Sequence, residues 1–171
     1  MRKKFSVFIK DRINGFNKKI FVESDKSISH RALLISSQCI GRSVIKKILE
    51  SEDVQNTILC LKKLGVKIIK KKGNYIVYGN GLGSFRNPKG NSLYTGNSGT
   101  LARMIMPLLA TQPNLKVKIS GDSSLNKRDM KRVIEPLSKI GCNFYPKDKT
   151  NLPITIEGTG MPLAQRHVES L

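Results

Sequence analysis

Lysine, serine and arginine side chains lie close together in the segment Asp25–Arg31, with the sequence DKSISHR. The segment follows a short apolar run and opens a stretch with helical spacing, so it should lie where a strand leads into a helix. The first turn of a helix has free N–H groups and a partial positive charge, which favour an anion. Lys26 is unfavourable there unless an anion offsets it, which indicates a phosphate or carboxylate site. Alternatively, Ser27 only caps the helix and Lys26 is only solvated.

A second candidate site is the loop Gly96–Thr100, with the sequence GNSGT, which precedes another helical segment. Its two glycines allow backbone N–H groups to approach a ligand closely, and Asn97, Ser98 and Thr100 add short polar side chains. The pattern is weak by itself, because many loops that cap helices have this composition. The glycine-rich run at 79–83 has no helix after it, so we interpret it as a linker rather than a nucleotide-binding loop.

A third candidate is the segment 126–128, Asn-Lys-Arg, at the start of a helix expected over 127–140. Two cations at a helix N-terminus cost about 0.3–1 kcal/mol each unless something compensates them. Asp129 could compensate in part, and Arg128 could hold a bound carboxylate or phosphate through two parallel N–H bonds. In the alternative interpretation both basic side chains point into solvent. The helix that begins after Ser51, by contrast, has the acidic first turn that stability alone would favour.

These loops require a scaffold of alternating strands and helices. Hydrophobic periodicity and turn residues predict two successive sets of elements. The first set has strands at 5–9, 19–22, 43–49, 66–69 and 75–78 and helices at 27–40 and 52–64. The first helix should end at Gly41, and its apolar residues recur at helical spacing: Ile28, Ala32, Ile35 and Cys39. The second helix should bury Val54, Ile58, Leu61 and Leu64. The second set has strands at 92–94, 115–120, 142–145 and 154–157 and helices at 100–111 and 127–140.

The order strand-helix-strand-helix-strand-strand occurs twice, which predicts an α/β (α+β) fold of repeated βαβαββ units. We place the first unit at 19–79, a glycine-rich linker at 80–91 and the second unit at 92–160. Residues 167–170 echo residues 21–24, so 161–171 should begin a third unit that is cut short. The first 18 residues precede the first unit and contain the strand expected at 5–9.

Composition limits the function classes. A net charge of +19 suggests nucleic-acid binding, but the lysines are scattered and aromatic residues are only 6% of the chain. No run is long enough to span a membrane, the N-terminus does not qualify as a signal peptide, and neither histidine has metal-ligand neighbours. Three widely spaced cysteines, each in an apolar segment, are expected to be buried thiols in a cytoplasmic protein.

The three segments together resemble the signature segments of the 5-enolpyruvylshikimate-3-phosphate synthase family. The resemblance covers about residues 5–171, and the segments occur in the order and at the spacing of that family: 25–31, 96–100 with Arg103, and 121–130. It implies a domain built of three βαβαββ units, with substrates in the cleft between this domain and a second one. This chain would be an N-terminal portion, and strands within residues 1–18 would pair with the second domain.

The resemblance also implies a reaction. The enolpyruvyl group of phosphoenolpyruvate is transferred to the 5-hydroxyl of shikimate 3-phosphate, and phosphate is released, without cofactor or metal. By this resemblance Lys26, Ser27 and Arg31 bind shikimate 3-phosphate. Five residues bind phosphoenolpyruvate: Lys26, Asn97, Gly99, Thr100 and Arg128. The complete protein would be monomeric, with small-molecule partners only.

The chain departs from the family pattern in Glu23–Ser24 before the first segment and in Asp129 after Arg128. No catalytic acid or base is expected in this chain, so we expect the isolated chain to bind substrates weakly without turnover. One rival is the enolpyruvyl transferase acting on UDP-N-acetylglucosamine, which typically has a reactive loop cysteine and an asparagine after the early lysine. The other rival is a basic nucleic-acid-binding module.

Overall fold

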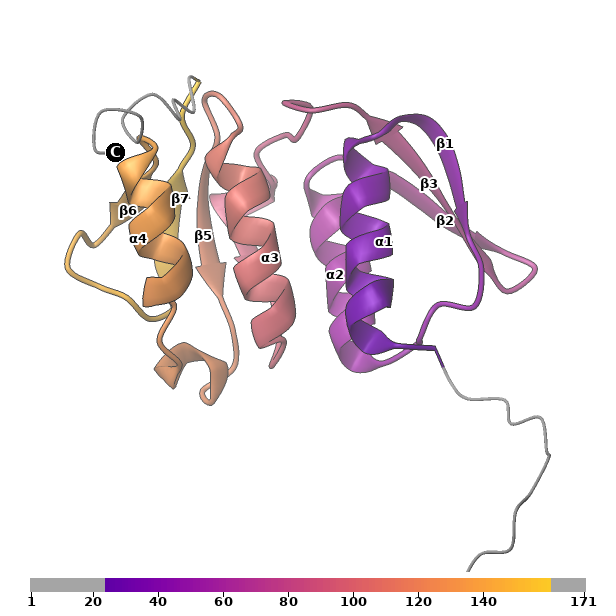
Figure 1. Cartoon of the computed structure of the whole chain (residues 1–171), viewed down its shortest axis with the longest axis horizontal. Coiled ribbons are helices and arrows are strands. Elements are labelled where there is room, and N and C mark those ends of the chain that lie inside the picture. The colour runs from indigo at the N-terminus through magenta and orange to yellow at the C-terminus, as the bar shows by residue number, and fades with distance from the viewer. Residues whose placement is uncertain (1–23, 161–171) are drawn as a thin grey trace, which may run out of the picture.

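The computed structural model describes residues 24–160. The strands expected at 5–9 and 19–22 and the third unit expected from 161 lie outside these residues. Within the described range the chain forms four α-helices and seven strands, which make two separate sheets (Figure 1).

The first set of elements combines an antiparallel sheet with two helices. Its strands lie in the order β1-β3-β2, and β1 pairs with β3 along its whole length. The elements are α1 (Lys26–Gln38), β1 (Ile40–Ile45), α2 (Glu52–Lys63), β2 (Lys67–Lys71) and β3 (Asn74–Asn80).

The second set is a mixed sheet in the order β4-β5-β7-β6, in which β4 and β5 are parallel and the other pairs are antiparallel. Short 3-10 turns occur at Lys89–Asn91 and Leu125–Lys127. The elements are β4 (Ser92–Tyr94), α3 (Gly99–Ala110), β5 (Lys116–Ser120), α4 (Lys131–Lys139), β6 (Asn143–Tyr145) and β7 (Ile154–Glu157).

The two sets share one hydrophobic core. Helix α3 contacts both α1 and α2, with the first sheet on one side of this helix group and the second sheet on the other (Figure 1). Fully buried apolar side chains continue from one set into the other: Leu33, Val54, Leu61, Leu101, Ile105 and Leu109. The α+β prediction is confirmed, and 92–160 has the expected strand and helix order. The unit boundaries themselves stay a prediction.

The first strand of this range was expected at 43–49 but lies at Ile40–Ile45. Helix α1 ends at Gln38, before the expected position, and Gly41 (φ +95°) lies within β1 instead of ending the helix. Pairing with β3 explains the shift, because every residue of β1 has a partner on that strand. Beyond the strand, the Leu49 N–H donates to Ser29 Oγ (3.0 Å), which holds this connection against α1.

The apolar face expected for α1 is wrong. Ile28 and Ile35 are 60% and 63% exposed, while the buried face contains Leu33, Leu34 and the polar side chain of His30. Cys39 is also exposed, whereas Cys60 and Cys142 are buried as expected. The periodicity identified the helix correctly but not the face that packs against the described residues.

The start of the fourth helix differs from the expectation as well. Helix α4 begins at Lys131, not at 127, because a 3-10 turn occupies Leu125–Lys127 and Arg128 is extended after it. The Met130 N–H donates to the Thr150 carbonyl (2.7 Å), and Asp129 bridges to Asn151. These contacts keep Arg128, Asp129 and Met130 outside the helix, which begins at Lys131. Lys127 and Arg128 are therefore not in the first turn of a helix.

Candidate functional site

The first candidate segment does lie at a helix N-terminus, and its cap is Asp25 rather than Ser27. Asp25 Oδ1 accepts a hydrogen bond from the Ile28 N–H (2.7 Å), as N-cap residues do. Lys26 is the first helical residue, and its ammonium pairs with Asp53 Oδ2 at 2.8 Å. A carboxylate of the protein therefore offsets the lysine charge. An anionic ligand is not required to explain Lys26, and it would compete with Asp53 for the ammonium group.

Ser27 and Arg31 remain open to a ligand. They lie one helical turn apart, so they share one face of α1. Arg31 is exposed and Ser27 is half-buried, and within the described range neither side chain has a hydrogen-bond or ion-pair partner. A hydroxyl and a guanidinium are thus presented together beside the ammonium group of Lys26.

His30, in the same segment, has a structural role between α1 and α2. Its side chain is fully buried, and Nδ1 lies 2.6 Å from Thr57 Oγ1 on α2. The Thr57 hydroxyl donates to the Asp53 carbonyl (3.2 Å), so its oxygen accepts a hydrogen bond from Nδ1–H of His30. Nε2 has no partner in the described part of the chain. Burial lowers the pKa of His30, with Asp53 raising it and Lys26 lowering it by smaller amounts. A neutral His30 therefore joins α1 to α2 one helical turn after the Lys26–Asp53 pair.

The second loop and the third segment meet at the N-terminus of α3. Ser98 caps this helix by accepting from the Leu101 N–H (3.2 Å). The Asn97 side chain receives a hydrogen bond from Arg128 Nη2 (3.0 Å) and donates one to Asp122 Oδ2 (2.5 Å). Residues about thirty positions apart are thus brought together at a helix end that favours an anion.

Gly99 explains why two guanidinium groups can lie at this helix end. A Cβ built on Gly99 would lie 3.3 Å from Arg128 Nη1 and 3.6 Å from Arg103 Nη1. The φ of Gly99 is not positive, so this glycine provides space and not an unusual backbone conformation. Thr100, the next residue of α3, is half-buried and has no side-chain hydrogen bond in the described range.

An electropositive pocket of about 530 Å³ adjoins this helix end. It is lined by Arg103, Arg128, Asp129 and Arg132. Asp129 is the acidic residue of the lining, and its Oδ1 accepts a hydrogen bond from the Lys131 N–H (2.8 Å). That bond, with the Thr150 side chain, lowers the Asp129 pKa. Three guanidinium groups therefore face one carboxylate, so the pocket is suited to an anion. Sequence reasoning missed Arg132, which no motif distinguished.

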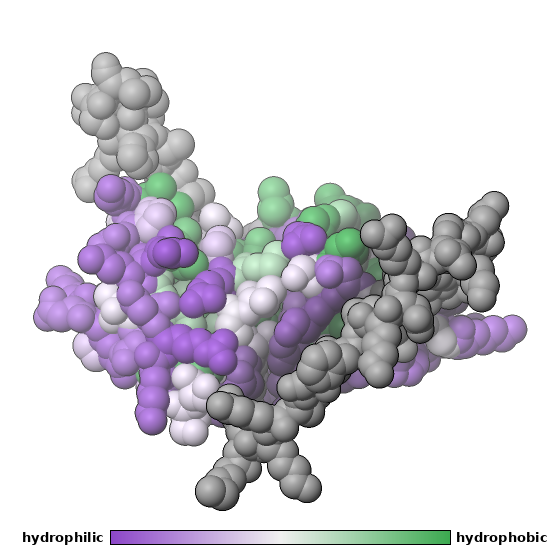
Figure 2. Space-filling model, turned by 60° about the horizontal axis from the view of Figure 1, so that its bottom comes forward, coloured by the Kyte–Doolittle hydropathy of each residue, from purple (hydrophilic) through white to green (hydrophobic). Residues whose placement is uncertain are grey.

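Helix α2 connects the two halves of the site. Asp53, in the first turn of α2, pairs with Lys26. One turn later, the Asn56 amide lies so close to Gly96 that a Cβ added to this glycine would overlap it. Helices α1, α2 and α3 all begin at the lower end of the molecule (Figure 1). This end comes forward in Figure 2, where it is mainly hydrophilic. The predicted residues of all three segments therefore lie at one polar end of the helix group.

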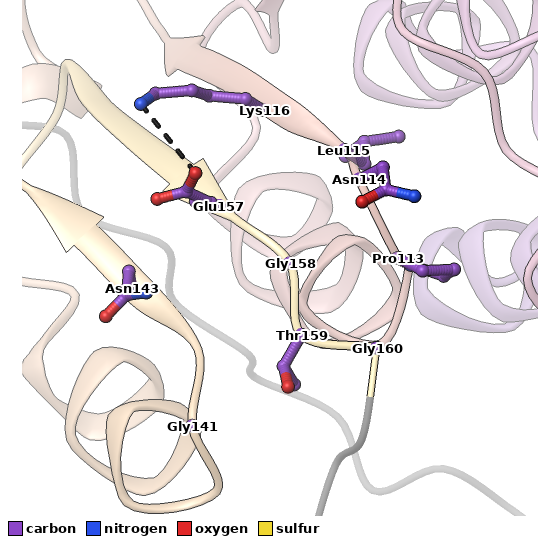
Figure 3. A pocket seen from close by; sticks show the side chains of 10 residues that line it. All are labelled: Pro113, Asn114, Leu115, Lys116, Gly141, Asn143, Glu157, Gly158, Thr159 and Gly160. Carbon is purple, nitrogen blue, oxygen red and sulfur yellow. Dashed lines mark ion pairs between the residues drawn. The ribbon is translucent and has the colours of Figure 1, made fainter.

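A second pocket of about 530 Å³ lies at the opposite end of α3, between β5, β7 and the start of β6 (Figure 3). Its charged residues, Lys116 and Glu157, pair with each other at 3.8 Å. Backbone and neutral side chains make up the rest of its lining: Pro113, Asn114, Leu115, Gly141, Asn143, Gly158, Thr159 and Gly160. The pocket lacks the excess of positive charge found at the other end.

Residues 24–160 contain no group of three or more His, Cys, Asp or Glu side chains placed to hold a metal ion. Within the same range, no helix is both long and apolar enough to cross a membrane.

Comparison with known proteins gives consistent results. A family described as EPSP synthase (3-phosphoshikimate 1-carboxyvinyltransferase) matches residues 10–170. The chain is 42% identical over 142 residues to the 3-phosphoshikimate 1-carboxyvinyltransferase of Paramagnetospirillum magneticum, covering 82% of this chain and 31% of the relative. It is 46% identical over 148 residues to the protein of that name from a Sulfurihydrogenibium species, covering 86% and 33%.

A solved structure of EPSP synthase from Acinetobacter baumannii has the same fold. It matches with a TM-score of 0.76 and 33% identity, over 84% of this chain and 32% of that chain. The chain thus spans about a third of the length of the curated relatives it matches.

Proposed function

The chain belongs to the EPSP synthase family, and we propose that it supplies one wall of the site in which the enolpyruvyl group of phosphoenolpyruvate is transferred to the 5-hydroxyl of shikimate 3-phosphate, releasing phosphate. The main observation behind the proposal is that Asn97, Gly99 and Arg128 lie together at the N-terminus of α3, beside the end of α1 that contains Lys26. Both substrates carry several negative charges, and this end of the molecule presents cations and the N-termini of α1 and α3.

Shikimate 3-phosphate is assigned to Lys26, Ser27 and Arg31. The hydroxyl of Ser27 and the guanidinium of Arg31, which have no partner among residues 24–160, support this assignment, because a phosphate accepts hydrogen bonds from both kinds of group. Lys26 can reach the ligand only by sharing its ammonium group with Asp53 or by leaving that carboxylate. The pair is partly exposed, so breaking it costs little.

Phosphoenolpyruvate is assigned to Lys26, Asn97, Gly99, Thr100 and Arg128. The addition step builds a tetrahedral intermediate that keeps the phosphate and carboxylate charges of phosphoenolpyruvate, and fixed cations and N–H groups stabilise these charges. We assign no acid or base of the reaction to these 171 residues. The role of this wall is to bind and orient two polyanions, with no cofactor. We further propose that the complete protein is a cytoplasmic monomer.

The cysteine environment argues against the rival transferase that acts on UDP-N-acetylglucosamine. Burial raises the pKa of Cys60 to about 11, and burial together with Glu157 raises that of Cys142 to about 12. Neither thiol is suited to react as a thiolate. Cys39 is exposed but lies where α1 ends, away from the helix N-termini.

Ligand titration of the ¹⁵N-labelled chain by NMR tests the proposal. We expect shikimate 3-phosphate to shift signals at the start of α1, and phosphoenolpyruvate added with it to shift signals at the start of α3. Lys26→Ala should weaken the binding of shikimate 3-phosphate, and Arg128→Ala should weaken the binding of phosphoenolpyruvate. Each Kd should rise by about 10- to 100-fold, as expected for the loss of a hydrogen bond from a charged group.

Matched controls are Lys62→Ala, on the last turn of α2, and Arg42→Ala, on β1. They remove the same charges away from the site and should leave both affinities unchanged. A folded chain that binds neither ligand at millimolar concentration would contradict the proposal. Salt-dependent binding of random DNA in its place would favour the nucleic-acid module.

A further inference from the structure

The carboxamide of Asn97 is held at both of its ends. Its Nδ2 donates to Asp122 Oδ2 at 2.5 Å, and its Oδ1 accepts from Arg128 Nη2 at 3.0 Å. An amide can be turned by 180° with little change in shape, so its orientation is fixed only by such partners. Here an acceptor faces the amino group and a donor faces the carbonyl group, which defines one orientation.

Asp122 is itself held firmly. Its Oδ1 accepts a hydrogen bond from the Leu125 N–H (2.7 Å), and its own N–H donates to the Gly96 carbonyl (2.9 Å). The Leu125 N–H and the Asn97 amide are the main causes of a lowered Asp122 pKa, and the charge of Arg128 adds to them. Asp122 therefore stays ionised near neutral pH, as a fixed acceptor between the loop at 96–100 and the turn that carries Arg128.

We propose that Asp122 is a positioning residue of the phosphoenolpyruvate site, acting through Asn97 on Arg128. Its two oxygens are used by Leu125 and Asn97, so it does not itself contact the anion. With Asn97 oriented, Arg128 is held through Nη2, and its Nη1 lies near Gly99 at the N-terminus of α3. The inference rests on the proposed function for the identity of the ligand, but the hydrogen-bonded chain of residues does not depend on it.

The substitution Asp122→Asn separates positioning from folding. Asparagine keeps an oxygen for the Leu125 N–H, so the local turn should be retained. Its amino group would then face Nδ2 of Asn97, donor against donor. If Asn97 turned to relieve this contact, its amino group would face the guanidinium of Arg128. Either arrangement removes the hydrogen bond that holds Arg128.

The first measurement needs no ligand. In the ¹⁵N spectrum of the unliganded chain, the Asn97 side-chain amide proton that is bonded to Asp122 should exchange with solvent more slowly than the amide protons of exposed asparagines that lack such a bond, and Asp122→Asn should abolish this difference. Asp148→Asn makes the same chemical change in an exposed loop and should have no effect. Unchanged exchange in Asp122→Asn would overturn the positioning role, whether or not the chain binds substrates.

The second measurement is the affinity for phosphoenolpyruvate in the presence of shikimate 3-phosphate. We expect Asp122→Asn to weaken the binding of phosphoenolpyruvate by about 10-fold, which is the loss expected for one hydrogen bond to a charged group. The binding of shikimate 3-phosphate should be unchanged. In an Asn97→Ala background the same substitution should have little further effect, because the intermediary is already absent.

Additive losses in this double-mutant cycle would overturn the claim that Asp122 acts through Asn97. Equal losses for both ligands would mean a general loss of structure and would overturn it as well. If the unsubstituted chain binds neither substrate, the proposed function fails, while the exchange measurement still decides the positioning role.

Discussion

Gly99 shows how one residue can matter through the side chain it lacks. Two guanidinium groups approach its Cα from Arg103 and Arg128, and the first residue of α3 would otherwise place a methyl group between them and the helix end. The space is tight but not closed, since the nearest guanidinium nitrogen would be 3.3 Å from an added Cβ. Binding and stability should therefore respond differently to a small side chain here.

We predict that Gly99→Ala weakens phosphoenolpyruvate binding without destabilising the fold. Moving a guanidinium by a few tenths of an ångström should cost about 1 kcal/mol of binding, or about fivefold in Kd. The helix should gain up to about 1 kcal/mol, because alanine favours helix more than glycine does. Calorimetric titration and urea unfolding of the same samples would check both. A large loss of stability together with affinity would contradict the spatial explanation.

At the scale of elements, α1 is held against the first sheet by a close backbone contact at Gly79 of β3. A Cβ on Gly79 would overlap the carbonyl oxygens of Ser36 and Cys39 at the end of α1. Backbone atoms cannot move aside as a flexible side chain can. The position of α1, and with it the position of Lys26, depends on this glycine.

Gly79→Ala should therefore destabilise the chain by about 1–3 kcal/mol, the usual cost of forcing extra atoms into a packed region. Gly160→Ala is the matched control, since a Cβ there would meet only the Pro113 Cβ at 3.7 Å, an ordinary contact. Urea unfolding monitored by circular dichroism gives both values. Equal stabilities of the two variants would show that α1 can shift away from β3 without cost.

The contact between α1 and α2 should make stability depend on pH through His30. Burial lowers the pKa of His30 in the folded chain below the ordinary value of about 6.5. As the pH falls, the unfolded chain takes up this proton first, which favours unfolding. The contribution is complete above about pH 6.5 and is lost as the pH falls toward the pKa of the folded chain.

The measurement compares the unfolding free energy of the chain with that of His30→Asn between pH 7.5 and pH 5, conditions that span the reference pKa of about 6.5. The difference between the two proteins should change with pH below this value and be constant above it. A difference that is constant over the whole range would show that His30 has the same pKa in both states.

At the scale of the whole molecule, this chain should bind the substrates without catalysing their reaction. The described end of the helix group gathers cations and helix N-termini, which can hold polyanions, while no acid or base of the reaction is assigned to these residues. We predict that the purified 171-residue chain binds both ligands weakly and releases no phosphate from them. A phosphate-release assay tests this. Release that requires both substrates and is lost in Lys26→Ala would contradict the prediction.

The sequence alone determined most of the local structure and the family of the protein. Turn residues and apolar periodicity placed most helices and strands, and α2 buries Val54, Ile58 and Leu61 as predicted. The three motifs identified the family, because their residue types and order are readable without coordinates. Asn97, Gly99 and Arg128 were assigned to one ligand from the family resemblance, and the structure does bring them together.

The tertiary structure decided what each of these residues contacts. Asp53 as the partner of Lys26, Asp122 as the partner of Asn97 and Arg132 in the pocket of arginines come from segments that packing brings together. It also decided that α4 begins at Lys131 and that Ile28 and Ile35 lie on the exposed face of α1. Periodicity along a chain reports which residues can share a face, whereas burial and pairing depend on neighbours distant in sequence.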